Sequence, residues 1–154
     1  MGKDLKKGLE QFGELAAKFM KETLSSKGKD ATGFLMNNIE VSISEKNDVQ
    51  DISIEMPDYG QYVDSGRKPG GKFPPPQAIK DWIKDKPIRL RGISIDSAAY
   101  LIGKKISEKG IEPTPFIEQS IDRAFEQGED IVLEAVEKEV AFTIEAAFKN
   151  TILK

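Results

Sequence analysis

A segment rich in glycine and proline divides the chain and limits what it can fold into. Residues 58–76, with the sequence DYGQYVDSGRKPGGKFPPP, contain four glycines and four prolines. Neither residue type supports the interior of a long helix or strand, so most of this segment must be a shaped loop. Within it, only Tyr62 and Val63 favour a short strand. Regular structure therefore has to form before residue 58 and after residue 76.

Before this segment, the apolar spacing predicts one helix followed by two strands. Residues 4–24 place apolar side chains on one face at helical spacing and charged side chains opposite. Residues 39–44 and 52–56 alternate apolar with polar side chains, which is the period of half-buried strands. A polar loop at 45–50 joins them. We therefore expect an antiparallel hairpin whose apolar face is covered by the first helix.

After this segment, proline, glycine and capping residues mark three helices. The first covers 78–86 behind a run of prolines and has Trp82 as a core anchor on its inward face. The second covers 96–109, and the third runs from Thr114, its expected cap, to the C-terminus. Residues 88–95 are ambiguous and leave room for one more strand.

Together these elements predict one α+β domain over residues 1–154, a length that suits a single domain. We expect a small antiparallel sheet, formed by the hairpin plus one or two short strands. It packs with an N-terminal helix, two short helices and a long C-terminal helix, which Gly128 is expected to interrupt.

The C-terminal helix is apolar on two nearly opposite sides. Such a helix is buried on both sides, either by other elements of the chain or by a second subunit. The first line consists of Leu133, Val136, Val140, Ile144 and Ala147, and the second of Ile131, Ala135, Phe142, Ala146 and Leu153.

The chain has neither cysteine nor histidine. It therefore has no disulfide, no zinc–thiolate site and no cysteine nucleophile, and it lacks the commonest general base. Any enzyme built on this sequence has to use carboxylates, lysine, serine or tyrosine. No carboxylate pair stands apart from an ordinary charged surface, so a carboxylate-based hydrolase is the weakest interpretation.

Two short motifs lack the context that their chemistry needs. Residues 66–72 match G-x-x-x-x-G-K, but Phe73 stands where a phosphate-binding loop has serine or threonine, and prolines follow instead of a helix. Residues 65–68 match S-x-x-K, which needs a helical turn that Gly66 and Pro69 disfavour. We therefore expect no catalytic residue, no cofactor, no metal site and no enzymatic activity.

Charge is unevenly distributed along the sequence. Residues 66–91 contain eight basic and two acidic residues, whereas 31–65 contain one basic and seven acidic, and 112–154 four basic and ten acidic. These patches can meet within one chain or between copies of it. The basic stretch, which has Tyr59, Tyr62, Phe73 and Trp82 nearby, also permits a nucleic-acid-binding module as an alternative.

Nothing near the N-terminus is typical of a signal peptide, and no stretch approaches the length of a membrane-spanning helix. We therefore expect a protein that is made in a cytoplasm and has no membrane partner.

Several segments resemble the tail-completion or head–tail joining proteins of tailed bacteriophages, the group that includes the lambda minor tail protein Z. The resemblance covers residues 5–125, although Asp64 stands where glutamate is common. The segments that carry it are Tyr59-Gly-Gln-Tyr62-Val63-Asp64-Ser-Gly66-Arg67, Phe73-Pro74, Ile79-x-x-Trp82-Ile83, Ala99-Tyr100-x-Ile102 and Gly110-Ile111-x-Pro113-Thr114-Pro115-Phe116-Ile117.

This resemblance implies a structural virion protein that forms a homo-oligomeric ring at the head–tail junction or the upper end of the tail. Its partners would be copies of itself and other neck, portal-side or tail-tube proteins, with DNA contact only as passage through the ring. A ring subunit needs two unlike surfaces that meet each other. The candidate interface residues are Arg67, Lys68, Lys72, Arg89, Arg91, Ile131, Ala135, Phe142 and Ala146.

Overall fold

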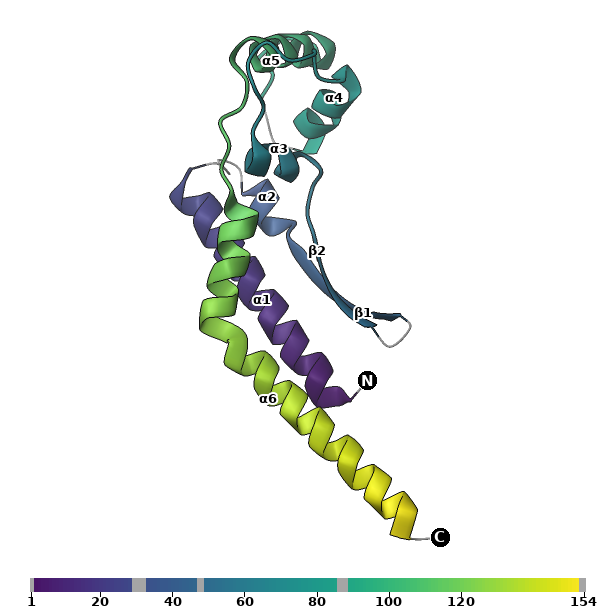
Figure 1. Ribbon diagram of the computed structural model, residues 1–154. Helices are drawn as coiled ribbons and strands as arrows, with labels where there is room; N and C mark the ends of the chain where they lie inside the picture. Colours follow the sequence, from purple (N-terminus) through teal and green to yellow (C-terminus); the bar gives the residue numbers. More distant parts are fainter. Residues whose placement is uncertain (1, 29–32, 47–48, 86–88, 153–154) are drawn as a thin grey trace. The chain divides into compact units, whose positions relative to one another are not determined.

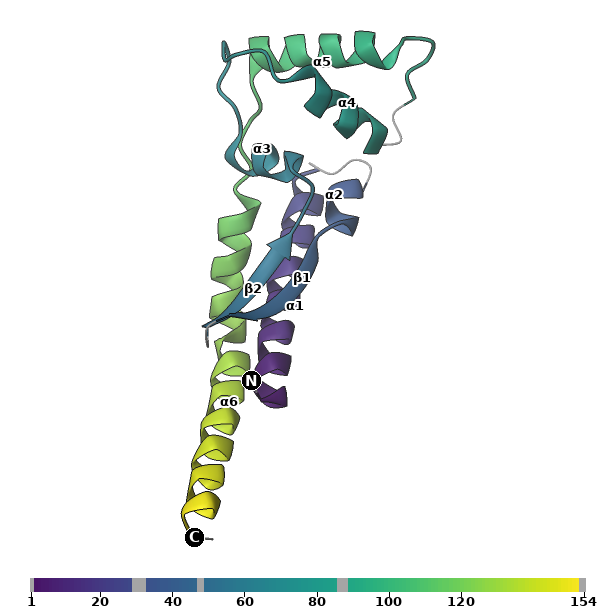
Figure 2. The same ribbon diagram turned by 90° about the vertical axis from the view of Figure 1, so that its right-hand side faces the viewer.

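The computed structural model describes residues 2–28, 33–46, 49–85 and 89–152, and it confirms the predicted α+β class. Within these ranges, six helices accompany one antiparallel hairpin of two strands (Figure 1 and Figure 2). In chain order the elements are α1 (Lys3–Ser26), α2 (Phe34–Asn37), β1 (Glu40–Lys46), β2 (Val49–Glu55), α3 (Tyr59–Ser65), α4 (Pro76–Asp85), α5 (Ile95–Lys109) and α6 (Phe116–Ile152).

The chain divides into two compact units, each assembled from separate stretches of sequence. Unit 1 consists of Met1–Glu22, Ile39–Glu55 and Glu118–Lys154, and unit 2 consists of Thr23–Asn38 and Met56–Ile117. Each unit has a cluster of buried apolar side chains of its own. The expectation of one domain over the whole chain stays a prediction.

In unit 1, α1 and the first half of α6 lie side by side and antiparallel (Figure 1 and Figure 2). A Cβ built on Gly8 would lie 2.3 Å from the Cβ of Ala135, and one built on Gly128 would lie 2.7 Å from Cδ2 of Leu15. Both glycines therefore let the two helices approach more closely than a side chain would permit. Because α6 continues through Gly128, the expected interruption there is wrong.

The core of unit 1 forms where these two helices meet. Phe12, Phe19 and Ala124 are buried there. The guanidinium of Arg123 lies 3.9 Å from the centre of the Phe19 ring and bonds to the carboxylate of Glu22 at 2.8 Å. This cation covers the edge of the core and links the two helices by a charge-assisted hydrogen bond.

The hairpin of unit 1 has the predicted alternation and cover. Val41 pairs with Ile54 and Ile43 with Ile52, so the apolar side chains share one face of the two strands. Gly13 of α1 lies against this face, and a Cβ built on it would lie 2.5 Å from Cγ1 of Val41. The first helix therefore covers the hairpin as the sequence indicates.

In unit 2, α4 packs against α5. Ile79 and Ile83 of α4 form a buried cluster with Ala98 and Ala99 of α5. Trp82 is only partly buried and packs at the margin of this cluster. The short helix is therefore anchored by its two isoleucines more than by the predicted tryptophan.

The further short strands expected at Tyr62–Val63 and within 88–95 are not found among the described residues. Tyr62 and Val63 belong to helix α3. Residues 89–94 form a turn and extended chain, while residue 88 lies outside the described ranges. Two apolar residues are too few to distinguish the helical period from the strand period. Gly60 also lets α3 pack closely on Leu35, because a Cβ on Gly60 would lie 3.1 Å from Cδ1 of Leu35.

Gly66→Ala is expected to lower the free energy of unfolding more than Gly70→Ala does. Both glycines have positive φ, 69° and 73°, so each substitution carries strain of about 1–2 kcal/mol. A Cβ on Gly66 would also lie 2.7 Å from main-chain atoms of Ile111 and Pro113, whereas one on Gly70 meets nothing within 4 Å. Urea unfolding should give a difference above about 2 kcal/mol, and equal losses would contradict this packing.

Candidate functional site

Two stretches that are far apart in the sequence meet in unit 2. The main-chain N–H of Arg67 donates to the carbonyl oxygen of Ile111 at 2.7 Å, and the N–H of Ile111 donates back at 2.8 Å. The N–H of Thr114 donates to the carbonyl oxygen of Val63 at 2.9 Å. These main-chain bonds join α3 and its C-terminal loop to the segment that leads into α6.

Asp64 completes this junction by capping α6. Its Oδ1 accepts a hydrogen bond from the N–H of Ile117 at 2.8 Å. The first N–H groups of a helix have no partner within it, and a carboxylate there satisfies one of them and interacts favourably with the helix dipole. We expected Thr114 to supply this cap. The capping residue instead lies 53 positions upstream, a distance at which no local motif can indicate it.

The loop that matches a phosphate-binding motif is fastened to α5 through its own backbone. The N–H of Gly70 donates to the carbonyl oxygen of Ser107 at 2.7 Å, and the hydroxyl of Ser107 donates to the carbonyl oxygen of Gly71 at 2.9 Å. The guanidinium of Arg67 donates to the carbonyl oxygen of Lys72. No helix follows Lys72 directly, since α4 begins at Pro76. The loop therefore lacks the arrangement that places phosphate at a helix N-terminus.

Four of the five predicted basic interface residues have exposed side chains. These are Lys68, Lys72, Arg89 and Arg91, whereas Arg67 is partly buried by its bond to the loop. All five lie in unit 2. The four exposed residues therefore give this unit a set of cations that face solvent.

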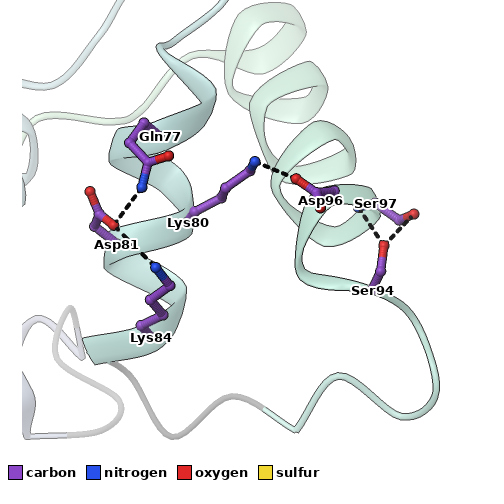
Figure 3. Close-up of polar contacts among 7 residues, drawn as sticks. All are labelled: Gln77, Lys80, Asp81, Lys84, Ser94, Asp96 and Ser97. Carbon is purple, nitrogen blue, oxygen red and sulfur yellow. Dashed lines mark hydrogen bonds and ion pairs between the residues drawn. The ribbon is translucent and has the colours of Figure 1, made fainter.

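Figure 3 shows that the cations of α4 are engaged within unit 2. Lys80 pairs with Asp96 at the start of α5, and Lys84 lies 3.7 Å from Asp81 on its own helix. Beside this pair, Ser94 caps α5 by accepting a hydrogen bond from the N–H of Ser97 at 3.1 Å. These contacts hold the two helices and the start of α5 together.

The apolar line of α6 that was predicted to form the subunit interface runs past the N-terminal start of α1. Ala135 is 6% exposed because Gly8 of α1 covers it, and Ile131 is partly buried. Phe142, seven residues further along the same face of α6, is 67% exposed, and Ala146 is partly exposed. The first half of this line is thus already occupied by the chain itself, while the second half is open.

The other apolar line of α6 is exposed along its length. Leu133, Val136, Val140 and Ile144 are all exposed, on the side of the helix away from Ala135. The spacing of its residues predicts this line, although the predicted subunit interface does not include it. From the sequence alone, α1 could pack against either apolar line of α6. The close approach of Gly8 to Ala135 shows that α1 packs on the line that contains Ala135.

One exposed ion pair borders these lines. Lys138 bonds to Glu134 one helical turn away at 2.7 Å. This hydrogen bond and the attraction between the two charges lower the pKa of the Glu134 carboxyl and raise the pKa of the Lys138 ammonium group. Glu139 accepts a hydrogen bond from the main-chain N–H of Gly2 at 2.9 Å, which marks where α1 begins opposite α6.

An open hollow lies between α1 and α6 and is lined by Gln11, Glu14, Leu15, Lys18 and Ile131. The described residues contain no group of three or more carboxylates placed to hold a metal ion. None of the described helices is both long enough and apolar enough to span a bilayer.

Comparisons with family models, curated proteins and solved structures find no match for this chain.

Asp64→Ala is expected to lower the free energy of unfolding by about 1–2 kcal/mol, because it leaves the N–H of Ile117 without its acceptor. Asp58→Ala is the matched control. Asp58 precedes α3 but makes no side-chain capping bond there, so its removal should change stability by less than about 0.5 kcal/mol. Chemical denaturation measures both. Equal effects would show that the Asp64 bond does not stabilise the junction.

Proposed function

We propose that this chain is a structural virion protein of a tailed phage, several copies of which form a ring at the head–tail junction or the upper end of the tail. The observation that carries the proposal is the C-terminal part of α6. There Val140, Phe142, Ile144 and Phe148 are each at least 50% exposed. Exposed apolar surface of this kind marks a site of protein association, so the chain has the character of a building block.

The junction in unit 2 supports the phage part of the proposal. The stretches that resemble tail-completion proteins are about 50 residues apart in the sequence, yet they form one hydrogen-bonded structure through Asp64, Arg67 and their partners. Under this proposal these residues shape the subunit and are not catalytic, and the chain needs no cofactor. Its other partners would be neck, portal-side or tail-tube proteins, with DNA passing only through the ring.

The charges of the two units support a ring of copies. Unit 1 contains ten basic and eighteen acidic residues, and unit 2 contains thirteen basic and eight acidic residues. Two unlike surfaces on one subunit allow head-to-tail contacts, which close into a ring when the rotation between neighbours permits it.

A nucleic-acid-binding module is the second candidate, because the exposed Lys72 precedes Phe73, whose ring stacks on the exposed Tyr100. Its binding to duplex or single-stranded DNA would weaken steeply as salt is raised. Gel-shift titrations of the purified chain at two salt concentrations test it. Salt-sensitive binding that is lost when Arg89 and Arg91 are replaced by alanine would favour this candidate over the ring.

Electron microscopy of phage particles tests the proposed function directly. Particles that carry a tagged chain should show several copies arranged in a ring at the neck or upper tail, and particles made without it should have heads and tails that fail to join. A single copy, or no copy, at that position would overturn the proposal.

Phe142→Asp is expected to block incorporation of the chain into particles while leaving its free energy of unfolding within about 0.5 kcal/mol of the parent value. The reason is that Phe142 is 67% exposed, so its replacement removes few contacts within the chain and chiefly affects contacts with a partner. Ser44→Asp is the matched control, since it adds the same charge at an exposed position on the hairpin and should be tolerated.

Ala135→Asp should behave in the opposite way. It would place a carboxylate against α1 at a site that is 6% exposed, and should lower the free energy of unfolding by about 2 kcal/mol or more. Denaturant unfolding of the purified variants distinguishes the two positions. If Phe142→Asp unfolds the chain as Ala135→Asp does, the end of α6 belongs to the intrachain core.

A further inference from the structure

The end of α6 carries exposed apolar side chains on two opposite sides, and it extends past the start of α1. Figure 1 and Figure 2 both show α6 continuing beyond the N-terminal end of α1. Val140 and Ile144 lie on one side of this extension and Phe142 on the other, and all are exposed. A helix with apolar side chains on two sides is normally buried on both, and a segment of about ten residues is a marginal helix in water without packing. This extension therefore needs a cover that the described part of its own unit does not supply.

Acidic side chains border the exposed line of α6, and they restrict what the cover can be. Leu133, Val136, Val140 and Ile144 follow one another at spacings of three, four and four residues, the pattern of a line that packs against another helix. The helical turns before and beside this line present Glu126, Glu129, Asp130 and Glu137, all exposed. Two such lines packed on each other would bring carboxylates together, so a partner surface with the opposite charge is favoured.

Unit 2 offers a surface of that kind on α5. Tyr100 and Leu101 are more than half exposed, and Lys104 and Lys105 follow one turn later on the same exposed side. The ring of Phe73 stacks on Tyr100 at a centroid distance of 5.8 Å, which widens the apolar patch. A Cβ on Gly103 would lie 2.6 Å from this ring, so Phe73 is held in place from beneath. The α5 face is therefore apolar, aromatic and basic.

We propose that the exposed line of α6 in one copy packs on the α5 face of a neighbouring copy. The line Leu133–Ile144 would contact Tyr100 and Leu101, and its acidic border would face Lys104 and Lys105. Because the two surfaces differ, each copy presents one to either neighbour, which is the condition for a ring. This contact deepens the proposed function and rests on it for closure of the ring, although the contact itself can be measured on the purified chain.

Single-cysteine variants test the contact cleanly, because the chain contains no cysteine of its own. Ile144→Cys and Leu101→Cys chains are purified separately, mixed, and treated with a mild oxidant. The mixed disulfide dimer should exceed either homodimer by about tenfold, since docking raises the effective concentration of that pair. Ile144→Cys mixed with Ser44→Cys, an exposed hairpin position, is the control and should give only a statistical mixture.

Two outcomes of this mixing experiment overturn the proposal. A statistical mixture of disulfides would show that the two surfaces do not dock. Dominance of the Ile144→Cys homodimer would show that α6 pairs with α6 of another copy instead.

Charge reversal tests which surfaces face each other. Glu129→Lys with Glu137→Lys on the Ile144→Cys chain should lower the mixed disulfide about tenfold, and so should Lys104→Glu with Lys105→Glu on the Leu101→Cys chain. Combining the two reversed chains should restore it. Glu40→Lys with Glu55→Lys, the same charge change on the hairpin, should leave the yield unchanged. Failure of the combined reversal to restore the disulfide overturns the proposed pairing.

The contact and the function fail separately. Particles without a ring would overturn the proposed function even if the purified chains form the mixed disulfide. Particles with a ring, whose cysteine variants give no mixed disulfide, would overturn only the contact between α6 and α5.

Discussion

The close approach of α1 to α6 determines which parts of unit 1 remain free. Gly8 and Gly128 remove the side chains that would keep the two helices apart, and they fix an antiparallel register in which Gly8 lies opposite Ala135. The bond from Gly2 to Glu139 marks the end of that register. Ala135 faces α1 before this point and is covered by it, whereas Leu133 and Val136 lie on the far side of α6 and stay exposed. Phe142 comes after Glu139 in α6 and is exposed.

A second constraint shapes unit 2. Gly66 adopts a positive φ and passes within van der Waals contact of the main chain at Ile111 and Pro113, which allows Arg67 to pair with Ile111. Gly110, also at positive φ, permits the same approach from the other side, since a Cβ on it would lie 2.2 Å from the carbonyl oxygen of Arg67. Because the backbone segments around Arg67 and Ile111 lie this close together, the carboxylate of Asp64 reaches the first turn of α6. The glycines therefore position the carboxylate that caps the longest helix.

The sequence was sufficient for features that depend on local periodicity. It predicted the N-terminal helix, the hairpin with its covered face, and the helices that became α4 to α6, because each has a repeated apolar spacing. The prediction from sequence was wrong where the same residues are compatible with two kinds of structure. Gly128 reads as a helix interruption but is a packing position, and Tyr62–Val63 reads as a strand but belongs to α3.

The candidate site was less predictable than the fold, because it depends on long-range contacts. The two apolar lines of α6 were evident from spacing, but only the position of α1 shows that Ala135 is covered and Phe142 is not. The sequence indicated five basic residues of unit 2 but not Lys104 and Lys105 of α5, and the partial burial of Arg67 depends on its bond to the loop carbonyl of Lys72. Composition cannot reveal either contact.

The acidic border of α6 gives the chain a way to carry an exposed apolar line without pairing it to itself. A free subunit with this much apolar surface risks association through the same line on another copy. Glu126, Glu129, Asp130 and Glu137 make that symmetric contact repulsive at neutral pH, and they add charge that favours solubility. The same carboxylates are attracted to a basic surface such as the one on unit 2. Under the proposed arrangement, one set of charges therefore opposes the wrong contact between copies and favours the right one. Because the apolar side chains supply most of the contact energy, the charges would act chiefly on which surfaces meet and how fast.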